Sequence, residues 1–258
     1  MFYNEIGDVM KLNKIIFSPT GGTKKVCEIL SSVFEMRPYE INLMKNVTYT
    51  VCNPDDLTIV CVPSFSGRVP ALAVERLKKI SGNGSKCILV VVYGNREIDD
   101  TLIELKDVMT SLGFKCIAGI KAVANHSIFR DFAVGRPDVD DETELKQFAL
   151  EIKNHLDTLE ECNVPGNRPY KDTKPNPFKP TASNACNECG LCAKSCPVHA
   201  IDLLDIKNVN KEICISCMHC ISICPTNARQ LNKLAVETAQ FTMKSKFEGR
   251  KENKLYLK

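Results

Sequence analysis

Residues 186–197 read Cys-Asn-Glu-Cys-Gly-Leu-Cys-Ala-Lys-Ser-Cys-Pro, and residues 214–225 read Cys-Ile-Ser-Cys-Met-His-Cys-Ile-Ser-Ile-Cys-Pro. Both segments have the spacing Cys-x2-Cys-x2-Cys-x3-Cys-Pro, and each cysteine of the first recurs at one constant offset in the second. Ala200 and Ala228 recur at the same offset. This internal duplication predicts two equivalent metal centres.

The spacing of these cysteines indicates the kind of centre that they bind. Three cysteines separated by two residues each let a short loop curl round one face of a cubane cluster, with backbone N–H groups pointing at its sulfurs. The fourth iron then needs a thiolate from another part of the chain. A zinc site would favour two Cys-x2-Cys pairs held apart by a longer insert, and a disulfide framework is typical of secreted chains. The repeat therefore predicts two [4Fe-4S] clusters.

The repeat resembles the bacterial two-cluster ferredoxins over its whole length. In that family the fourth ligand of each cluster comes from the opposite half of the repeat, and the proline after each fourth cysteine turns the chain away from its own loop. Such clusters exchange electrons at low potential, so another part of the chain or a partner must supply or receive them. The resemblance implies one ligand set of Cys186, Cys189, Cys192 and Cys224, and a second of Cys214, Cys217, Cys220 and Cys196.

The whole chain has the composition of an ordinary globular protein. It has 258 residues, 44% hydrophobic and 25% charged, which leaves room for a second domain. A formal net charge of +3 does not indicate binding to nucleic acid or to a membrane surface. The segment from Met1 to Lys11 has no apolar run of signal-peptide length, and no stretch is long enough to span a membrane. We expect a cytoplasmic protein of an anaerobic cell, with Met1 or Met10 as its first residue.

Six further cysteines lie outside the repeat, and none is paired at a metal-ligand spacing. Several of them lie in or beside apolar, strand-like runs, where cysteine behaves as a small buried hydrophobic residue. We expect these six to be packing residues: Cys27, Cys52, Cys61, Cys87, Cys116 and Cys162.

The first 160 residues alternate apolar strand-like segments with segments of helical periodicity. Buried parallel strands are nearly continuous in apolar residues, and strand-helix alternation predicts an α/β fold with a doubly wound, parallel, five-stranded sheet. In such a sheet ligands bind at the carboxyl ends of the strands, where the strand order switches. The predicted strands are 12–17, 38–43, 57–62, 86–93 and 114–123, and the helices follow at about 23–33, 69–80, 98–112 and 142–159.

Three loops leave the carboxyl ends of these strands. Residues 18–23, Ser-Pro-Thr-Gly-Gly-Thr, precede a helix, whose free first-turn N–H groups favour an anion such as phosphate. Residues 63–70 and 93–97 each place an aromatic residue near glycine, which suits a flat ring. Each loop also has an ordinary explanation, namely helix capping, a core aromatic residue, or a turn. Together the loops predict a ligand with a phosphate group and a planar heterocycle.

This N-terminal part resembles flavodoxin. The family's phosphate loop, Ser/Thr-x-Thr-Gly-x-Thr, is matched from Ser18 to Thr23, but Gly22 stands where flavodoxins commonly carry asparagine, so one side-chain donor is absent. The resemblance implies FMN as the cofactor, with Phe65 on or beside the isoalloxazine ring, Gly94 and Asn95 at its pyrimidine edge, and Arg96 near N1. No catalytic residue is assigned. The candidate FMN-binding residues are Ser18, Thr20, Gly21, Gly22, Thr23, Ser64, Phe65, Ser66, Gly67, Tyr93, Gly94, Asn95 and Arg96.

A loop containing His126 follows the last predicted strand and could face either the flavin or the cysteine repeat. A lone loop histidine is more often a surface or capping residue, so His126 is not assigned to the site.

Five prolines between residues 163 and 183 mark a semi-extended linker. The predicted organisation is a flavodoxin-like FMN-binding domain at 10–160, a Pro-rich linker at 161–183, a small α+β ferredoxin domain at 184–230, and a basic, partly helical tail at 231–258. The tail either packs back on a domain or docks an acidic redox partner.

This order of domains resembles a family of flavodoxin–ferredoxin fusion proteins of anaerobic bacteria and archaea. It implies electron transfer between FMN and two [4Fe-4S] clusters, and on to or from a separate redox partner protein. One alternative is an NAD(P)H- or quinone-linked flavin-dependent reductase, although no Gly-x-Gly-x-x-Gly follows a strand. A second alternative is a redox sensor, which only the basic tail favours. The sequence does not indicate the oligomeric state.

Overall fold

A computed structural model describes residues 10–258 of the chain. Residues 1–9, on which the expected absence of a signal peptide mainly rests, lie outside this described part. No helix within residues 10–258 is long and apolar enough to cross a membrane.

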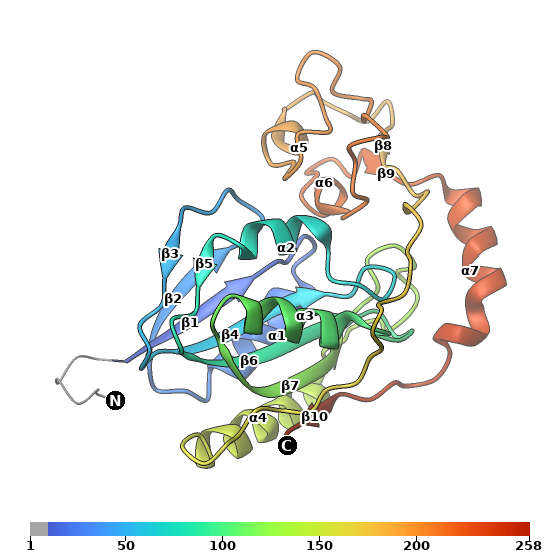
Figure 1. The fold of residues 1–258 in the computed structure, drawn as a ribbon. Coiled ribbons are helices and arrows are strands. Elements are labelled where there is room, and N and C mark those ends of the chain that lie inside the picture. The colour runs from blue at the N-terminus through green and yellow to red at the C-terminus, as the bar shows by residue number, and fades with distance from the viewer. Residues whose placement is uncertain (1–9) are drawn as a thin grey trace.

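The central sheet contains five parallel strands, β1 (Lys11–Ile16), β2 (Arg37–Asn42), β4 (Leu57–Pro63), β6 (Lys86–Tyr93) and β7 (Lys115–Val123). Their spatial order is β2-β1-β4-β6-β7, so that the chain order reverses between β1 and β4 (Figure 1). Counted among the parallel strands alone, this is the order 2-1-3-4-5 of flavodoxin-like sheets. The predicted fold class of this part is therefore confirmed.

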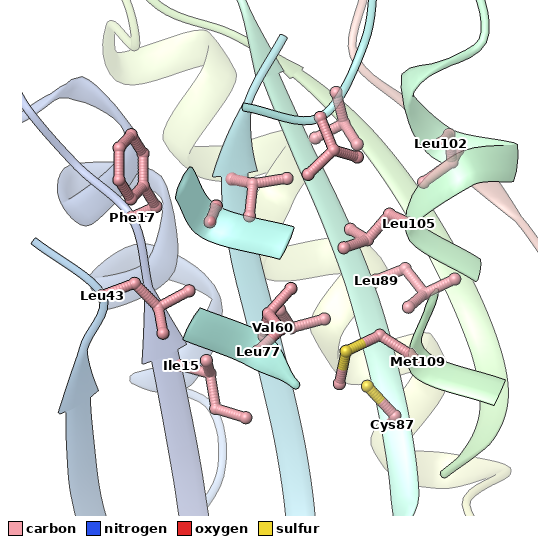
Figure 2. Packing of buried hydrophobic residues seen from close by; sticks show 14 of the residues in the cluster. Ile15, Phe17, Leu43, Val60, Leu77, Cys87, Leu89, Leu102, Leu105 and Met109 are labelled. Carbon is pink, nitrogen blue, oxygen red and sulfur yellow. The ribbon is translucent and has the colours of Figure 1, made fainter. Parts of the chain in front are cut away.

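The helices on the two faces of the sheet are α1 (Gly22–Ser31) and α4 (Val139–Asn154) on one side, and α2 (Ala71–Leu77) and α3 (Thr101–Ser111) on the other. Alternate residues of a strand face opposite sides of its sheet. Ile15, Val60 and Leu89 accordingly pack in the hydrophobic core beneath α2 and α3 (Figure 2), while Ile16 and Cys61 belong to the core beneath α1 and α4. The residues of both cores are buried, so the strands are held in place on both faces of the sheet. The loops at the carboxyl ends of the strands are therefore held in place as well.

The six cysteines outside the repeat are all buried free thiols, which confirms their role in packing. Burial raises the pKa of Cys52 to about 11 and that of Cys162 to about 12, so these thiols stay protonated at neutral pH.

A sixth strand, β10 (Lys254–Tyr256), runs antiparallel to β7 at the edge of the sheet. It comes from the C-terminal end of the chain, so the tail returns to the sheet after the cysteine repeat (Figure 1). The predicted set of five parallel strands is present, and this antiparallel edge strand is an addition that the sequence did not predict. Two small sheets pair β3 (Thr50–Val51) with β5 (Ile80–Ser81), and β8 (Thr181–Ala182) with β9 (Arg229–Gln230).

The duplication of the cysteine repeat is visible in its backbone. The two short helices α5 (Leu191–Lys194) and α6 (His219–Ser222) each follow a residue in the left-handed conformation, Gly190 and Met218. Positive φ angles also recur at the matching pairs Glu188/Ser216 and His199/Asn227. The same turns are therefore built twice, as two equivalent cysteine loops require. Helices α5 and α6 lie side by side in the part of the repeat that is nearer the α/β domain, and loops extend beyond them (Figure 1).

Candidate functional site

The three loops predicted to bind a ligand line one cavity of about 1030 Å³ at the carboxyl edge of the sheet. This is close to the upper end of the range for small-molecule pockets, about 300–1,000 Å³. Three predicted residues, Ser18, Gly21 and Asn95, do not line it. The predicted residues that do are Thr20, Gly22, Thr23, Ser64, Phe65, Ser66, Gly67, Tyr93, Gly94 and Arg96.

The first loop presents the N-terminus of α1. Gly21, at φ 92°, precedes the helix and offers no side-chain cap, and the first turn holds no acidic residue. Ser18 Oγ accepts a hydrogen bond from the Lys24 N–H at 2.9 Å, so this hydroxyl stabilises the helix start outside the cavity lining. The positive end of the helix dipole therefore lies beside the cavity without a carboxylate to neutralise it, which suits a phosphate group.

The second loop is a tight turn held by its own backbone. Phe65 and Arg68 exchange N–H···O bonds of 3.0 and 3.1 Å across Ser66 and Gly67, which both have positive φ. A Cβ at Gly67 would lie 2.1 Å from Asp99 Oδ2, so only glycine fits there. The Arg68 guanidinium donates two hydrogen bonds to the buried Glu104 carboxylate at 2.7 and 2.8 Å. Phe65 is thus presented to the cavity from a rigid support.

The third loop meets two other segments of the chain. A Cβ at Gly94 would lie 2.5 Å from the His126 ring, so the absence of a side chain allows this close approach. The Asn95 amide donates to the carbonyls of Phe247 and Gly249 at 2.5 and 2.8 Å. Its side chain is therefore engaged with the tail and not directed to the expected pyrimidine edge. Arg96 lines the cavity and forms an ion pair with Asp99.

His126 lines the cavity, although the sequence analysis left it unassigned. Its ring stacks on Phe129, with centroids 5.0 Å apart, and lies edge-on to Phe247. Nδ1 accepts the N–H groups of Ile128 and Phe129, both at 3.0 Å. Burial, assisted by the charge of Arg96, lowers the pKa of His126 to about 4, so the ring is neutral and carries its proton on Nε2. His126 follows β7 in the sequence, so its loop leaves the sheet at the same edge as the three predicted loops. This position was the sequence feature that could have assigned it to the site.

The cysteine repeat forms a further wall of the same cavity. Cys214 and Cys217 line it, together with linker residues 173–176, 178 and 179 and with Met243 and Phe247 of the tail. Helix α6 also contacts the first loop, where His219 Nδ1 lies 2.6 Å and Ser222 Oγ 3.2 Å from the Pro19 carbonyl oxygen. One of the two predicted cluster loops therefore lies beside the predicted flavin site.

The cysteines of the second ligand set lie close to one another across the two halves of the repeat. Burial raises the pKa of Cys217 to about 11, and the neighbouring thiols of Cys196 and Cys214 act in the same direction. Cys196 comes from the first half of the repeat, so the two halves approach each other at Cys217. Cys220 is partly buried, which raises its pKa to about 12, and it packs against the small core that contains Cys192 of the first half.

The sulfur atoms receive backbone hydrogen bonds. Ala200 N–H donates to Cys196 Sγ at 3.3 Å. Burial acts to raise the pKa of Cys224, but the N–H groups of Arg229, Thr226 and Ala228 and the Thr226 hydroxyl outweigh it and lower that pKa. All eight thiols are free, and no group of three His, Cys, Asp or Glu side chains within residues 10–258 is placed to hold a single metal ion. A donor set made of thiols and directed N–H groups fits iron–sulfur clusters.

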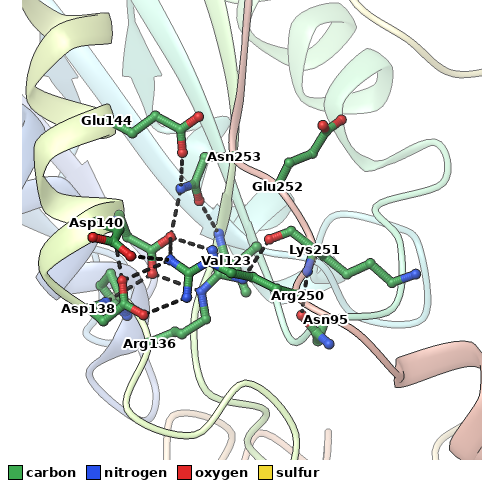
Figure 3. Close-up of polar contacts among 12 residues, drawn as sticks. Asn95, Val123, Arg136, Asp138, Asp140, Glu144, Arg250, Lys251, Glu252 and Asn253 are labelled. Carbon is green, nitrogen blue, oxygen red and sulfur yellow. Dashed lines mark hydrogen bonds and ion pairs between the residues drawn. The ribbon is translucent and has the colours of Figure 1, made fainter.

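The tail is fixed to the α/β domain by a buried polar network (Figure 3). Asn253 donates to Asp141 at 2.8 Å and to Glu144 at 2.7 Å, and its carbonyl oxygen accepts the Val123 N–H at 2.8 Å. Arg250 pairs with Asp138 through bonds of 2.6 and 2.9 Å. Helix α7 (Lys233–Phe247) spans the distance from the cysteine repeat to this network (Figure 1).

The Pro-rich linker is also attached along its length. Asp100 accepts the N–H groups of Asn167 and Lys171 at 2.8 and 2.7 Å, and Asp107 accepts Arg168 Nε at 2.8 Å. The cysteine repeat is therefore held to the α/β domain by an anchored segment on each side.

Comparison with known proteins identifies the C-terminal segment. Residues 181–240 match the family model described as the 4Fe-4S dicluster domain. No curated protein sequence matches the chain.

Several solved structures are similar to the N-terminal part. Oxidised flavodoxin 1 from Bacillus cereus is 17% identical, with 56% of this chain and 98% of that chain covered and a TM-score of 0.43. The apo form of an NADH:FMN oxidoreductase is 14% identical, with 58% and 91% covered and a TM-score of 0.44. A flavodoxin variant from Fusobacterium nucleatum, bound to flavin mononucleotide, is 15% identical, with 57% and 95% covered and a TM-score of 0.39.

Proposed function

We propose that this chain, in which an α/β domain of flavodoxin strand order carries a 4Fe-4S dicluster domain, is an electron-transfer iron–sulfur flavoprotein. It passes electrons between FMN and two [4Fe-4S] clusters, and on to or from a separate redox partner. One observation carries the proposal: Cys214 and Cys217 line the same cavity as the three predicted flavin loops.

The resemblance to two-cluster ferredoxins implies two ligand sets. We name Cys196, Cys214, Cys217 and Cys220 the proximal set, because two of its members line the cavity. We name Cys186, Cys189, Cys192 and Cys224 the distal set. When bound, FMN supplies a centre that exchanges electrons singly or in pairs, while each cluster passes one electron at a time.

The residues of the cavity divide into phosphate-binding and ring-binding groups. Gly22 and Thr23 present N–H groups at the start of α1 for the phosphate. Phe65 packs against the ring from the rigid second turn, and Gly94 allows the backbone to approach it. Arg96 provides a positive charge that favours the reduced, anionic flavin.

We further propose a cytoplasmic location in an anaerobic cell, because all 14 cysteines are free thiols and disulfides are rare in reducing compartments. We also propose a flavodoxin-like domain at 10–160, a linker at 161–183 and a ferredoxin domain at 184–230. We call residues 231–258 the strap, because they lead back from the ferredoxin domain to the sheet.

A cofactor count on protein handled without oxygen tests the proposal. We expect about one FMN and about eight irons per chain, with as much acid-labile sulfide as iron. About eight irons with no flavin, even after FMN is added, would contradict the flavin assignment. Rapid anaerobic bleaching of the flavin by NADH or NADPH would instead support a nicotinamide-linked reductase.

A further inference from the structure

The distal end of the cysteine repeat exposes an unusual number of leucines. Leu191 is 42% exposed, Leu203 57% and Leu204 96%. Two of them lie beside the exposed Cys189: Leu191 follows Gly190, and Leu203 lies against the same glycine, 3.2 Å from a Cβ placed there. Leu204 is the next residue of the same exposed turn. We call these three leucines and Cys189 the distal face.

The leucines are held outward by an ordered turn. Asp202 accepts the Leu204 N–H at 2.8 Å, and Asp205 accepts the Asn208 amide at 2.8 and 3.1 Å. Ile201 and Ile206, on either side of this turn, are buried in the small core of the domain. The exposed leucines therefore belong to a fixed surface, and burying them in an interface would be favourable.

The rim of the distal face carries more acidic than basic side chains. Glu188, Asp202 and Asp205 are exposed there, against Lys207, which pairs with Glu188 at 3.6 Å, and the exposed Lys194, whose Cε lies 3.7 Å from a Cβ placed at Gly190. The two aspartates have no cationic partner among the contacts of the described residues. A bound cluster adds negative charge to the same face. A basic partner surface is therefore favoured, whereas a second copy of this face would oppose like charges.

The proximal end offers no equivalent surface to a protein. Cys214 and Cys217 face the cavity between the domains, and α6 is bonded to Pro19 of the α/β domain. The linker and the tail, through Phe178, Met243 and Phe247, close the same region. Of the described residues beside the cluster loops, Ile213 next to Cys214 is 46% exposed at the proximal end, whereas three leucines are exposed together at the distal end. The distal end therefore offers a protein partner the larger apolar surface.

We propose that the distal face is the docking surface for a one-electron redox protein whose contact patch is apolar with a basic rim. This inference rests on the proposed function. With clusters bound, the distal cysteine set would hold the centre that gives one electron to the partner's centre, so that one is oxidised and the other reduced with no bond made or broken. The proximal set would hold the centre between it and the flavin cavity.

Anaerobic stopped-flow oxidation of the fully loaded, chemically reduced protein tests this proposal, with cytochrome c as the basic one-electron probe. The double variant Leu203→Gln/Leu204→Gln is compared with Leu234→Gln, which alters a leucine that is 74% exposed on α7. We expect the second-order rate constant to fall at least tenfold in the double variant, to stay unchanged in the Leu234 control, and to fall with ionic strength in the unmodified protein. Oxidation by a small viologen dye, which needs no docking surface, should be equal in all three.

Three outcomes would overturn the proposal. Equal cytochrome c rates for the double variant and the control would show that the leucines do not dock the probe. A parallel loss of the viologen rate would show that the substitutions damage the cluster itself. Concentration-dependent dimerisation abolished by the double variant would assign the face to a second copy. Iron, sulfide and FMN are counted in every variant, so a chain that lacks the cofactors contradicts the proposed function, while a fully loaded chain with unchanged rates contradicts only the docking surface.

Discussion

His126 is a buried histidine whose environment disfavours protonation. Its Nδ1 already accepts two N–H groups, and burial lowers its pKa to about 4. Since this is below the value of about 6.5 in an unfolded chain, its neutral form stabilises the fold fully above pH ~6.5. That contribution is lost as the pH falls from there towards 4.

We therefore expect the ring signals of His126 in an NMR titration to stay constant from about pH 8 to pH 5, while a solvent-exposed histidine titrates near 6.5. His126→Asn identifies the resonance and keeps an acceptor for the two N–H groups. Titration of His126 near neutral pH would contradict its burial against Gly94.

Gly67 and Gly84 have almost the same positive φ, 86° and 85°, but very different surroundings. A Cβ at Gly67 would collide with Asp99, whereas one at Gly84 would meet nothing within 4 Å. Alanine at either site should lower the free energy of unfolding by about 1 kcal/mol, because its Cβ disfavours a positive φ. The loss should be distinctly larger at position 67, because the Cβ would also collide with Asp99. FMN affinity should fall only in Gly67→Ala, since that turn presents Phe65. Denaturant unfolding and flavin fluorescence measure the two effects, and equal losses in both variants would contradict this account of the second loop.

Helix α6 joins the cluster loop to the phosphate loop through a single carbonyl oxygen, that of Pro19. His219→Ala removes one of its two donors, so we expect weaker FMN binding, by about 1 kcal/mol or roughly fivefold in Kd. His219→Asn retains an N–H near the same position and should restore most of the affinity. His155→Ala, at an exposed histidine of the C-terminal end of α4, is the control. The iron content must be the same in all three variants. Equal FMN affinity in all three would show that the contact of α6 with Pro19 does not support FMN binding.

Elements whose signal is local were predictable from the sequence. β6 and β7 are continuous apolar runs, and the loops after β1, β4 and β6 carry glycine, hydroxyl and aromatic residues, so both the sheet and the cavity edge followed. β10 was not predictable, because three residues carry little pattern and their pairing with β7 depends on long-range contacts. The engagement of Asn95 with the tail was missed for the same reason, since its partners Phe247 and Gly249 are remote in sequence.

At the scale of the whole molecule, the tail network decides how firmly the cysteine repeat is held. Asn253→Ala removes the bonds to Asp141, Glu144 and Val123, and we expect a loss of about 1–3 kcal/mol because Asp141 is buried. Glu252→Ala is the matched control, since its carboxylate is 70% exposed and pairs with Lys121 at 3.6 Å. Hydrogen exchange in residues 247–256 should accelerate only in Asn253→Ala. Unchanged exchange would show that the strap is held by other contacts.

The same network responds to acid. Burial acts to raise the pKa of Asp141, but the bonds from Arg136, the Asp138 N–H and Asn253 outweigh it and lower that pKa. The stabilisation from this carboxylate is therefore complete above the ordinary aspartate pKa of about 4 and is lost as the pH falls below it.

The return of β10 to the sheet also sets an order of events during translation. The edge strand beside β7 is synthesised after every cysteine of the repeat. At about 5–20 residues per second, the ribosome needs roughly a few seconds to pass from Cys224 to Tyr256. During that interval the cysteines of the repeat have been added to the chain but β10 has not, so the repeat cannot yet be tied to the edge of the sheet. The sheet edge beside β7 is therefore completed only after both cysteine loops have been synthesised.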